Sequence, residues 1–175
     1  EFRRVLFRSY TKQVHGTHIA EADPTKHGLH SESREEADGL YTTRPNTIAV
    51  QTADCLPLLV YSEKDPFIMA VHAGWRGLAK GIVGNAVKLA QRHCTSKENL
   101  RVLIGPAISA ECFEVGGEVI EAFAKFIHPT QMEVLTNKGK EDRWFFDLWG
   151  AAAFTLVDHG IRPENITVLK RSEEH

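Results

Sequence analysis

The sequence has few cysteines, little excess charge of either sign and no long apolar run. Its three cysteines, Cys55, Cys94 and Cys112, are an odd number at wide spacing, which argues against a disulfide framework and for reduced thiols. The formal net charge is only -2, and no run of like charge is long enough for a nucleic-acid footprint. No apolar stretch approaches the roughly 20 residues of a membrane span, and no charged-then-apolar leader opens the chain. We therefore expect a cytoplasmic protein with neither nucleic-acid nor membrane partners.

The length and composition are those of one globular domain. The chain has 175 residues, of which 42% are hydrophobic and 25% charged, close to the average for folded domains. Residues 1–9 and 171–175 resemble translated sequencing-library adapter, although a basic amphipathic start and a polar tail are the alternative interpretation. We therefore predict a single catalytic domain over residues 10–170.

Segments typical of strands dominate the first half of the chain. Residues 10–20 alternate enough to form a strand that carries Val14 and Ile19 inward. Residues 23–36 are rich in charge, His, Ser and Gly, and this composition predicts an exposed loop. Central strands are predicted from three apolar runs that turn-forming residues separate. These runs are residues 47–51, 56–61 and 67–71.

Apolar residues recur at helical spacing in three later segments. These segments are residues 78–92, 115–127 and 148–158. Pro129 is expected to end the second helix, whereas Asp147 is the predicted N-cap of the third and Gly160 its C-terminal stop. Strands are predicted at residues 101–104 and 166–169. This order predicts a layered α/β fold in which helices cover a mixed β-sheet core.

Polar residues gather where the predicted strands end, and His15, Cys55 and His72 are among them. A thiolate and two neutral imidazoles suit Zn²⁺, and three protein ligands leave a fourth position for water or substrate. The three residues lie too far apart in the chain for a compact metal motif, and there are nine histidines to choose from. A core cysteine with two strand-end histidines bonded to backbone is the alternative interpretation.

The segment that follows the third apolar run has the composition of an anion-binding turn. Gly74 and Gly77 would let backbone approach a ligand, and Arg76 offers a planar fork for phosphate or carboxylate. The alternative is a turn made by the glycines beside a solvated Arg76. Further along, Cys112 would be a nucleophile if a base stood near it, but a small buried hydrophobic residue is the favoured interpretation.

Several motifs in a characteristic order carry a family resemblance. They are Gln13-Val14-His15-Gly16, Ala37-Asp38-Gly39-Leu40, Thr52-Ala53-Asp54-Cys55-Leu56-Pro57, His72-Ala73-Gly74-Trp75-Arg76-Gly77, and Ile104-Gly105-Pro106 with Cys112-Phe113-Glu114-Val115-Gly116. With them the chain resembles the bacterial YfiH-type laccase-domain family from about residue 12 to residue 169. Members of that family are described as purine nucleoside phosphorylases, peptidoglycan editing factors and, formerly, polyphenol oxidases.

The resemblance implies that His15, Cys55 and His72 hold a metal ion, usually zinc, in a pocket that accepts a purine nucleoside. It also implies phosphorolysis of adenosine, inosine and methylthioadenosine, together with deamination of adenosine. Water activated by zinc suits attack on C6 of adenine. The expected partners are therefore small molecules, namely a purine nucleoside and phosphate.

Three further residues are expected to be catalytic. Arg76, with the helix start expected after Gly77, is the hypothetical phosphate cradle. Asp54 directly precedes Cys55 and Gln13 lies two residues before His15 in the chain, and we expect them to orient the ligands or the attacking water. A simple turn residue is the alternative interpretation of Asp54.

Two other functions stay open at this point. A copper-dependent polyphenol oxidase would need many copper ligands, typically from His-x-His pairs, and the sequence has none of these pairs. A peptidoglycan-precursor editing or binding protein would carry a structural metal, normally with four protein ligands. Members of the family are longer at both ends, so the chain is expected to be truncated. Where this chain has Ser109 to Cys112, the family often has a pair of cysteines, which weakens a nucleophilic role for Cys112.

Overall fold

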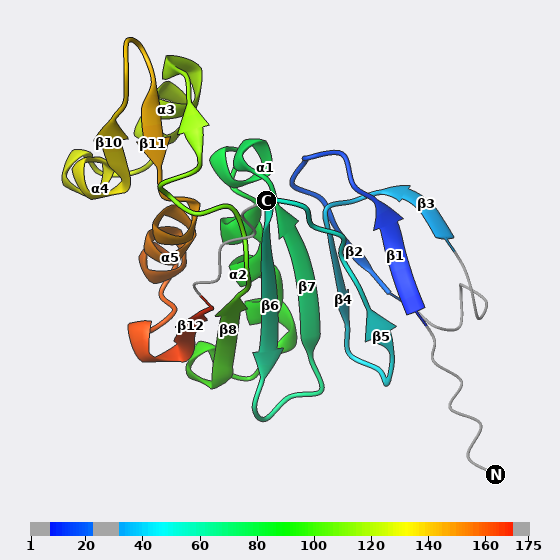
Figure 1. Cartoon of the computed structure of the whole chain (residues 1–175). Helices are drawn as coiled ribbons and strands as arrows, with labels where there is room; N and C mark the ends of the chain where they lie inside the picture. Colours follow the sequence, from blue (N-terminus) through cyan, green and yellow to red (C-terminus); the bar gives the residue numbers. More distant parts are fainter. Residues whose placement is uncertain (1–7, 23–31, 170–175) are drawn as a thin grey trace.

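The computed structural model describes residues 8–22 and 32–169, and a mixed six-stranded sheet lies at its centre (Figure 1). The strand order across this sheet is β12-β8-β6-β7-β4-β2. The bounds of these strands are β2 (Ile19–Glu21), β4 (Gly39–Thr42), β6 (Leu56–Ser62), β7 (Ile68–Ala73), β8 (Leu100–Ile104) and β12 (Ile166–Val168). Parallel and antiparallel neighbours both occur in it, so the predicted mixed sheet is confirmed.

Alternation along β6 explains why one face of the sheet is buried. Leu56, Leu58 and Val60 are at most 2% exposed, whereas Leu59 and Tyr61 between them are 45% and 44% exposed. Successive side chains of a strand point to opposite faces. Leu56, Leu58 and Val60 therefore enter the main core, which the helices complete.

The described part of the chain contains five α-helices. Their bounds are α1 (Trp75–Ala79), α2 (Ile82–His93), α3 (Gly117–Ala124), α4 (Pro129–Leu135) and α5 (Leu148–Asp158). In Figure 1, α2 lies behind β6 and β7, and α5 lies beside it at the left of the sheet. No helix in residues 8–22 and 32–169 has the length and apolar character needed to cross a membrane. The predicted fold class, a mixed sheet covered by helices, is confirmed.

Two small three-stranded sheets flank the central one (Figure 1). One has the order β3-β1-β5 and the other the order β10-β11-β9. Their bounds are β1 (Arg8–Lys12), β3 (Glu32–Glu36), β5 (Thr47–Ile48), β9 (Glu114–Val115), β10 (Thr136–Lys138) and β11 (Trp144–Phe146). Two 3-10 turns, Lys97–Asn99 and Pro163–Asn165, precede β8 and β12.

The N-terminal strand prediction is wrong in its extent. Residues 10–20 form no single strand, because β1 ends at Lys12 and β2 begins at Ile19. The loop between them turns through His15, whose φ is 58°, and Val14, predicted to point inward, is 42% exposed. A residue in the left-handed region cannot continue an extended strand, so the chain leaves one sheet here and enters another.

The predicted loop over residues 23–36 is wrong at its C-terminal end. Its last five residues form β3, which pairs in parallel with β1, and its residues 23–31 lie outside the described part of the chain. Strand β4 was not predicted, because Gly39–Thr42 contains no apolar run. It forms because both of its edges are paired, with β2 on one side and β7 on the other.

Two predicted helices have different bounds in the structure. The helix expected over residues 78–92 is divided into α1 and α2 at Gly81, whose φ of 94° breaks helical geometry. The helix expected over residues 115–127 is shortened to Gly117–Ala124. Pro129 does not end it but opens α4, where proline needs no backbone N–H partner.

Candidate metal centre

Three separate elements bring the predicted metal ligands together. His15 lies in the loop between β1 and β2, Cys55 lies just before β6, and His72 is the second-last residue of β7. Because β6 and β7 are antiparallel, with Pro57 opposite His72, the start of one strand adjoins the end of the other. The three residues predicted as ligands therefore meet at one end of the central sheet.

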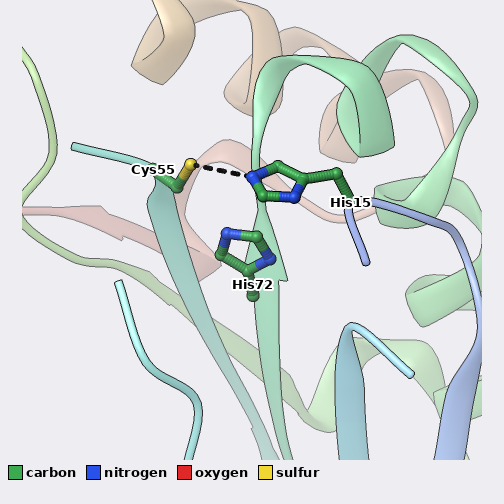
Figure 2. Close-up of side chains that lie close together, drawn as sticks. All are labelled: His15, Cys55 and His72. Atoms are coloured by element: carbon green, nitrogen blue, oxygen red, sulfur yellow. Dashed lines mark hydrogen bonds between the residues drawn. The ribbon is translucent and has the colours of Figure 1, made fainter. Parts of the chain in front are cut away.

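The donor atoms of the three side chains form a compact cluster (Figure 2). Cys55 Sγ lies 3.8 Å from His15 Nε2, and the ligand atoms all lie within 4.8 Å of one another. The two imidazole rings meet edge to face, with centroids 4.8 Å apart and an interplanar angle of 83°. Both imidazoles and the thiol therefore face one small volume.

This donor set fits a metal ion of the size of zinc. Zinc bonds of about 2.0–2.3 Å in tetrahedral geometry place donor atoms about 3.4–3.6 Å apart, close to the 3.8 Å between Cys55 Sγ and His15 Nε2. Nδ1 of His72 is already paired with Asp38 Oδ1, so Nε2 remains available to a metal ion. Among the described residues this is the one such group of three or more His, Cys, Asp or Glu side chains.

Sequence reasoning gave no role to Asp38, which lies directly beneath the cluster. Its side chain is 0% exposed, and Oδ1 lies 2.9 Å from His72 Nδ1. Three backbone N–H groups also donate to this carboxylate, from Val14 at 3.2 Å, His15 at 2.8 Å and Gly16 at 2.7 Å. The signal was present in the Ala37-Asp38-Gly39-Leu40 motif, but its partners lie 22 to 34 residues away in the sequence.

Hydrogen bonds outweigh burial in setting the pKa of Asp38. Burial alone would raise the pKa of this carboxyl, but the bonds from His72 and from the backbone of Gly16, Val14 and His15 lower it below its usual 3.8. Asp38 is therefore a carboxylate at neutral pH and serves only as an acceptor.

The pKa of Cys55 is shifted in the opposite direction. Burial raises the pKa of the thiol above 9.0, and the nearby negative charges of Asp54 and Asp38 raise it further. A metal cation would offset both effects because it stabilises the thiolate. The surroundings of Cys55 thus favour a thiol without a cation and a thiolate ligand beside one.

Two glycines let the backbone come close to the ligands. A Cβ atom on Gly74 would lie 2.6 Å from His15 Cδ2 and 3.2 Å from Cys55 Sγ. A Cβ atom on Gly77 would lie 2.7 Å from the carbonyl oxygen of Gly16. The spacing of these glycines therefore serves to pack the start of α1 against the His15 loop.

Gln13 and Asp54, two of the residues predicted to be catalytic, lie within two residues of His15 and Cys55 in the chain. Gln13 Nε2 donates to the carbonyl oxygen of Gln51 and its Oε1 accepts from the Gln51 N–H, each at 2.7 Å. Asp54 is exposed, has a φ of 67° and accepts from the N–H of Ile108 through its carbonyl oxygen at 3.1 Å. Gln13 thus joins the His15 loop to the segment that leads to Cys55.

Arg76 lies on α1, and its guanidinium stacks 4.4 Å above the ring of Trp75. The side chain is exposed. The helix start expected after Gly77 is wrong, because α1 begins at Trp75 and Gly77 lies inside it. The prediction failed because Gly74, with extended backbone, already precedes the first helical turn.

Cys112 does not have the surroundings predicted for it. The favoured interpretation was a buried hydrophobic residue, but Cys112 is exposed. Its N–H donates to the carbonyl oxygen of Ser109 at 3.1 Å in a turn before β9. The turn brings the side chain to the surface. The hydrophobic character of a cysteine does not by itself predict this position.

The chain is similar to several known proteins. Residues 5–173 match a family model described as multi-copper polyphenol oxidoreductase laccase. The chain is 38% identical to purine nucleoside phosphorylase YfiH of Escherichia coli, over 87% of this chain and 58% of that protein. It is 31% identical to adenosine deaminase RL5 of an unknown prokaryotic organism, over 89% of this chain and 61% of that protein.

A solved structure shares the fold. The hypothetical protein YfiH of Bacillus licheniformis superposes with a TM-score of 0.85 at 28% identity, covering 94% of this chain and 64% of that one. The chain thus spans about three fifths of the length of the relatives it matches. The family match, the relatives and the superposed structure together show that the chain belongs to the laccase-like YfiH family.

Proposed function

We propose that the chain forms the zinc-dependent part of a purine nucleoside phosphorylase that also deaminates adenosine. Adenosine, inosine and methylthioadenosine are the proposed substrates, with phosphate as the second substrate. The observation that carries the proposal is a cluster of three side chains that could hold a metal ion, with no fourth His, Cys, Asp or Glu grouped with them among the described residues. Catalytic zinc sites have this stoichiometry. Relatives named purine nucleoside phosphorylase and adenosine deaminase support the substrate class.

Zinc is the proposed metal because one thiolate and two imidazoles are donors that it prefers. When bound, zinc supplies Lewis-acid chemistry and activates water near neutral pH. His15 and Cys55 would reach it from the loop and from the start of β6, and His72 from β7. None of the three cysteines forms a disulfide, which fits the reducing cytosol predicted from the sequence.

In deamination, the oxygen of water attacks C6 of adenine and the amino group leaves as ammonia. One group must take a proton from the water and a proton must reach the departing amine. Asp54 is the proposed group, because it is exposed beside Cys55 and its charge acts on the Cys55 thiol. Gln13 acts indirectly, since both of its polar atoms bind Gln51 and hold the His15 loop.

In phosphorolysis, a phosphate oxygen attacks C1′ of the ribose and the purine base departs with the electrons of the glycosidic bond. The phosphate must be held beside the ribose, and Arg76 is the proposed group. Its guanidinium is exposed at the start of α1, and its stacking on Trp75 limits the orientations it can adopt.

Copper-dependent polyphenol oxidation is the second candidate, because the matching family model carries that description. A multi-copper enzyme needs several copper sites. Residues 8–22 and 32–169 offer one cluster of three ligands, and this count favours the nucleoside reaction. Binding of a peptidoglycan precursor around a structural metal is less well supported, since structural zinc normally has four protein ligands.

The proposal is tested by measuring bound metal in the purified chain and by incubating it with adenosine, with and without phosphate. We expect about one zinc per chain, with formation of inosine and a phosphate-dependent release of adenine. Cys55→Ala removes the thiolate donor, so it should lower metal content and both activities by at least about 100-fold. Mass spectrometry of the metal and chromatography of the products give these values.

Cys112→Ala is the matched control, because Cys112 is an exposed cysteine outside the cluster. It should leave metal content and turnover unchanged. Equal metal content and turnover in wild type and Cys55→Ala would refute the proposal. Oxidation of a phenol that depends on added copper would establish the second candidate instead.

A further inference from the structure

We infer that Asp38 is a positioning residue that sets both histidine ligands of the metal centre at once. Its carboxylate selects the proton position on His72 and holds the backbone of His15 in an uncommon conformation. The inference rests on the proposed metal site and adds a residue that touches neither metal nor substrate. Each of its two effects has its own geometric basis.

The first effect concerns the imidazole of His72. Three backbone N–H groups already donate to the Asp38 carboxylate, so the carboxylate is an acceptor. Nδ1 of His72, 2.9 Å from Oδ1, must therefore carry the proton and donate it. Nε2 then keeps its lone pair and is the nitrogen that can bind a metal. His72 is 4% exposed, so water cannot easily replace this partner.

The second effect concerns the loop that carries His15. Consecutive N–H groups of Val14, His15 and Gly16 converge on the two carboxylate oxygens, at 2.7–3.3 Å. His15 has a φ of 58°, a conformation that residues other than glycine rarely adopt. An anion is the natural partner for such a concave set of backbone N–H groups. Asp38 therefore supplies from inside the protein the charge that keeps the loop in this form.

The pairing of β4, which begins directly after Asp38, does not depend on the Asp38 side chain. The backbone carbonyl oxygen of Asp38 accepts from the His72 N–H at 2.7 Å, and β4 pairs with β7 from Gly39 to Thr42. These bonds need no carboxylate, so a substitution of similar size can leave the sheet in place. Asp38→Asn is such a substitution, since it changes one oxygen to an amide nitrogen.

Asparagine cannot satisfy all the donors that meet at Asp38. If its NH₂ group faces His72, Nδ1 must accept and Nε2 takes the proton, which blocks metal binding. If its NH₂ group faces the loop, it meets backbone N–H groups that are themselves donors. In the full chain we therefore expect Asp38→Asn to bind zinc about 10- to 100-fold more weakly than wild type, which is the usual loss when a group that orients a metal ligand is removed.

Glu36→Gln is the matched control. It removes one negative charge two residues earlier, from an exposed side chain paired with Lys12 at 2.7 Å. It should leave zinc affinity unchanged. If Glu36→Gln weakens zinc binding as much as Asp38→Asn, the effect is one of net charge and the inference fails. Equal affinity in Asp38→Asn and wild type would also overturn it.

A second measurement needs no metal. Long-range ¹H–¹⁵N NMR of the metal-free wild type should show His72 with its proton on Nδ1, and Asp38→Asn should lose this single tautomer. A purely structural role for Asp38 would leave the tautomer unchanged. Zinc binding by wild type with a proton on Nε2 of His72 would overturn the inference and keep the proposed function. Absence of zinc binding by wild type, with the proton on Nδ1, would refute the proposed function alone.

Discussion

The two halves of the candidate metal centre are built in different ways. The strand half consists of His72 on β7 and Cys55 before β6, where paired strands hold the backbone and His72 is 4% exposed. The loop half consists of the β1–β2 loop with His15, which is exposed and has a φ of 58°. In the strand half the sheet ladder sets the position of the donors. In the loop half side-chain hydrogen bonds set it.

This difference indicates which changes affect folding and which affect metal binding alone. In the strand half, the chain neighbours of Cys55 and His72 belong to the main core, namely Leu56, Val71 and Ala73, so changes there act on the stability of the whole domain. The loop half contributes no residue to the buried part of that core. Its geometry can therefore change while the domain stays folded. Three predictions test this separation, in order of decreasing effect.

Gly74→Ala should have the largest effect, because Gly74 lies where the two halves meet. The added Cβ would lie 2.6 Å from His15 Cδ2 and 3.2 Å from Cys55 Sγ, so both ligands must move. The backbone of Gly74, with φ −64° and ψ 158°, suits alanine, and the effect is therefore steric. We expect about 100-fold weaker zinc binding, measured by competition with a chelating dye.

Gly117→Ala serves as the control for that change. A Cβ on Gly117 would meet nothing nearer than Trp144 at 3.8 Å, so zinc binding should be unaffected. Unchanged affinity in Gly74→Ala would mean that the ligands can move apart freely, and the close approach at Gly74 would then have no role in metal binding.

Gln13→Ala should have a smaller effect, confined to the loop half. It removes both bonds to the Gln51 backbone, but Gln51 is exposed and water can replace them. We expect about tenfold weaker zinc binding with little change in the thermal unfolding midpoint of the metal-free protein. Gln91→Ala, at an exposed position on α2, is the control. A clear drop in the unfolding midpoint of Gln13→Ala would contradict the separation of the two halves.

A substitution of Asp65 should have the smallest effect on zinc binding, because Asp65 lies at the end of the β6–β7 hairpin opposite to Cys55 and His72. The Ser62 hydroxyl donates to its carboxylate at 2.7 Å, and this bond, with those from Thr95 and the charge of Lys64, lowers the pKa of Asp65 below 3.8 despite some opposing burial. Its folded-state pKa is thus below the unfolded value. The stabilisation is complete above the unfolded value and is lost as the pH falls through the folded one.

Thermal unfolding of the metal-free protein between pH 7 and pH 3 measures this effect. Wild type should unfold at a higher temperature than Asp65→Asn at pH 7, and the difference should shrink below about pH 3.8. Zinc affinity at pH 7 should be equal in the two proteins. A difference that grows as the pH falls would show that the sign is wrong.

Elements were predictable where a local signal decides them. Asp147 caps α5 by accepting from the Gly150 N–H at 3.0 Å, and Gly160 follows the same helix with a φ of 86°, both as predicted. The signals in these cases lie within a few residues of the structure they determine. Strand β4 had no such signal, because its formation depends on pairing with β2 and β7.

The sequence by itself determined the ligand types of the candidate site and the mixed sheet on whose strand ends they lie. His15, Cys55 and His72 were predicted to be ligands from their donor chemistry and from motif order, and the structure brings them together. Tertiary structure alone decided that Asp38 lies beneath them, because its partners come from the β1–β2 loop and from β7. The residue type alone determines the donor chemistry of a side chain, whereas the pairing of distant strands determines which groups orient it.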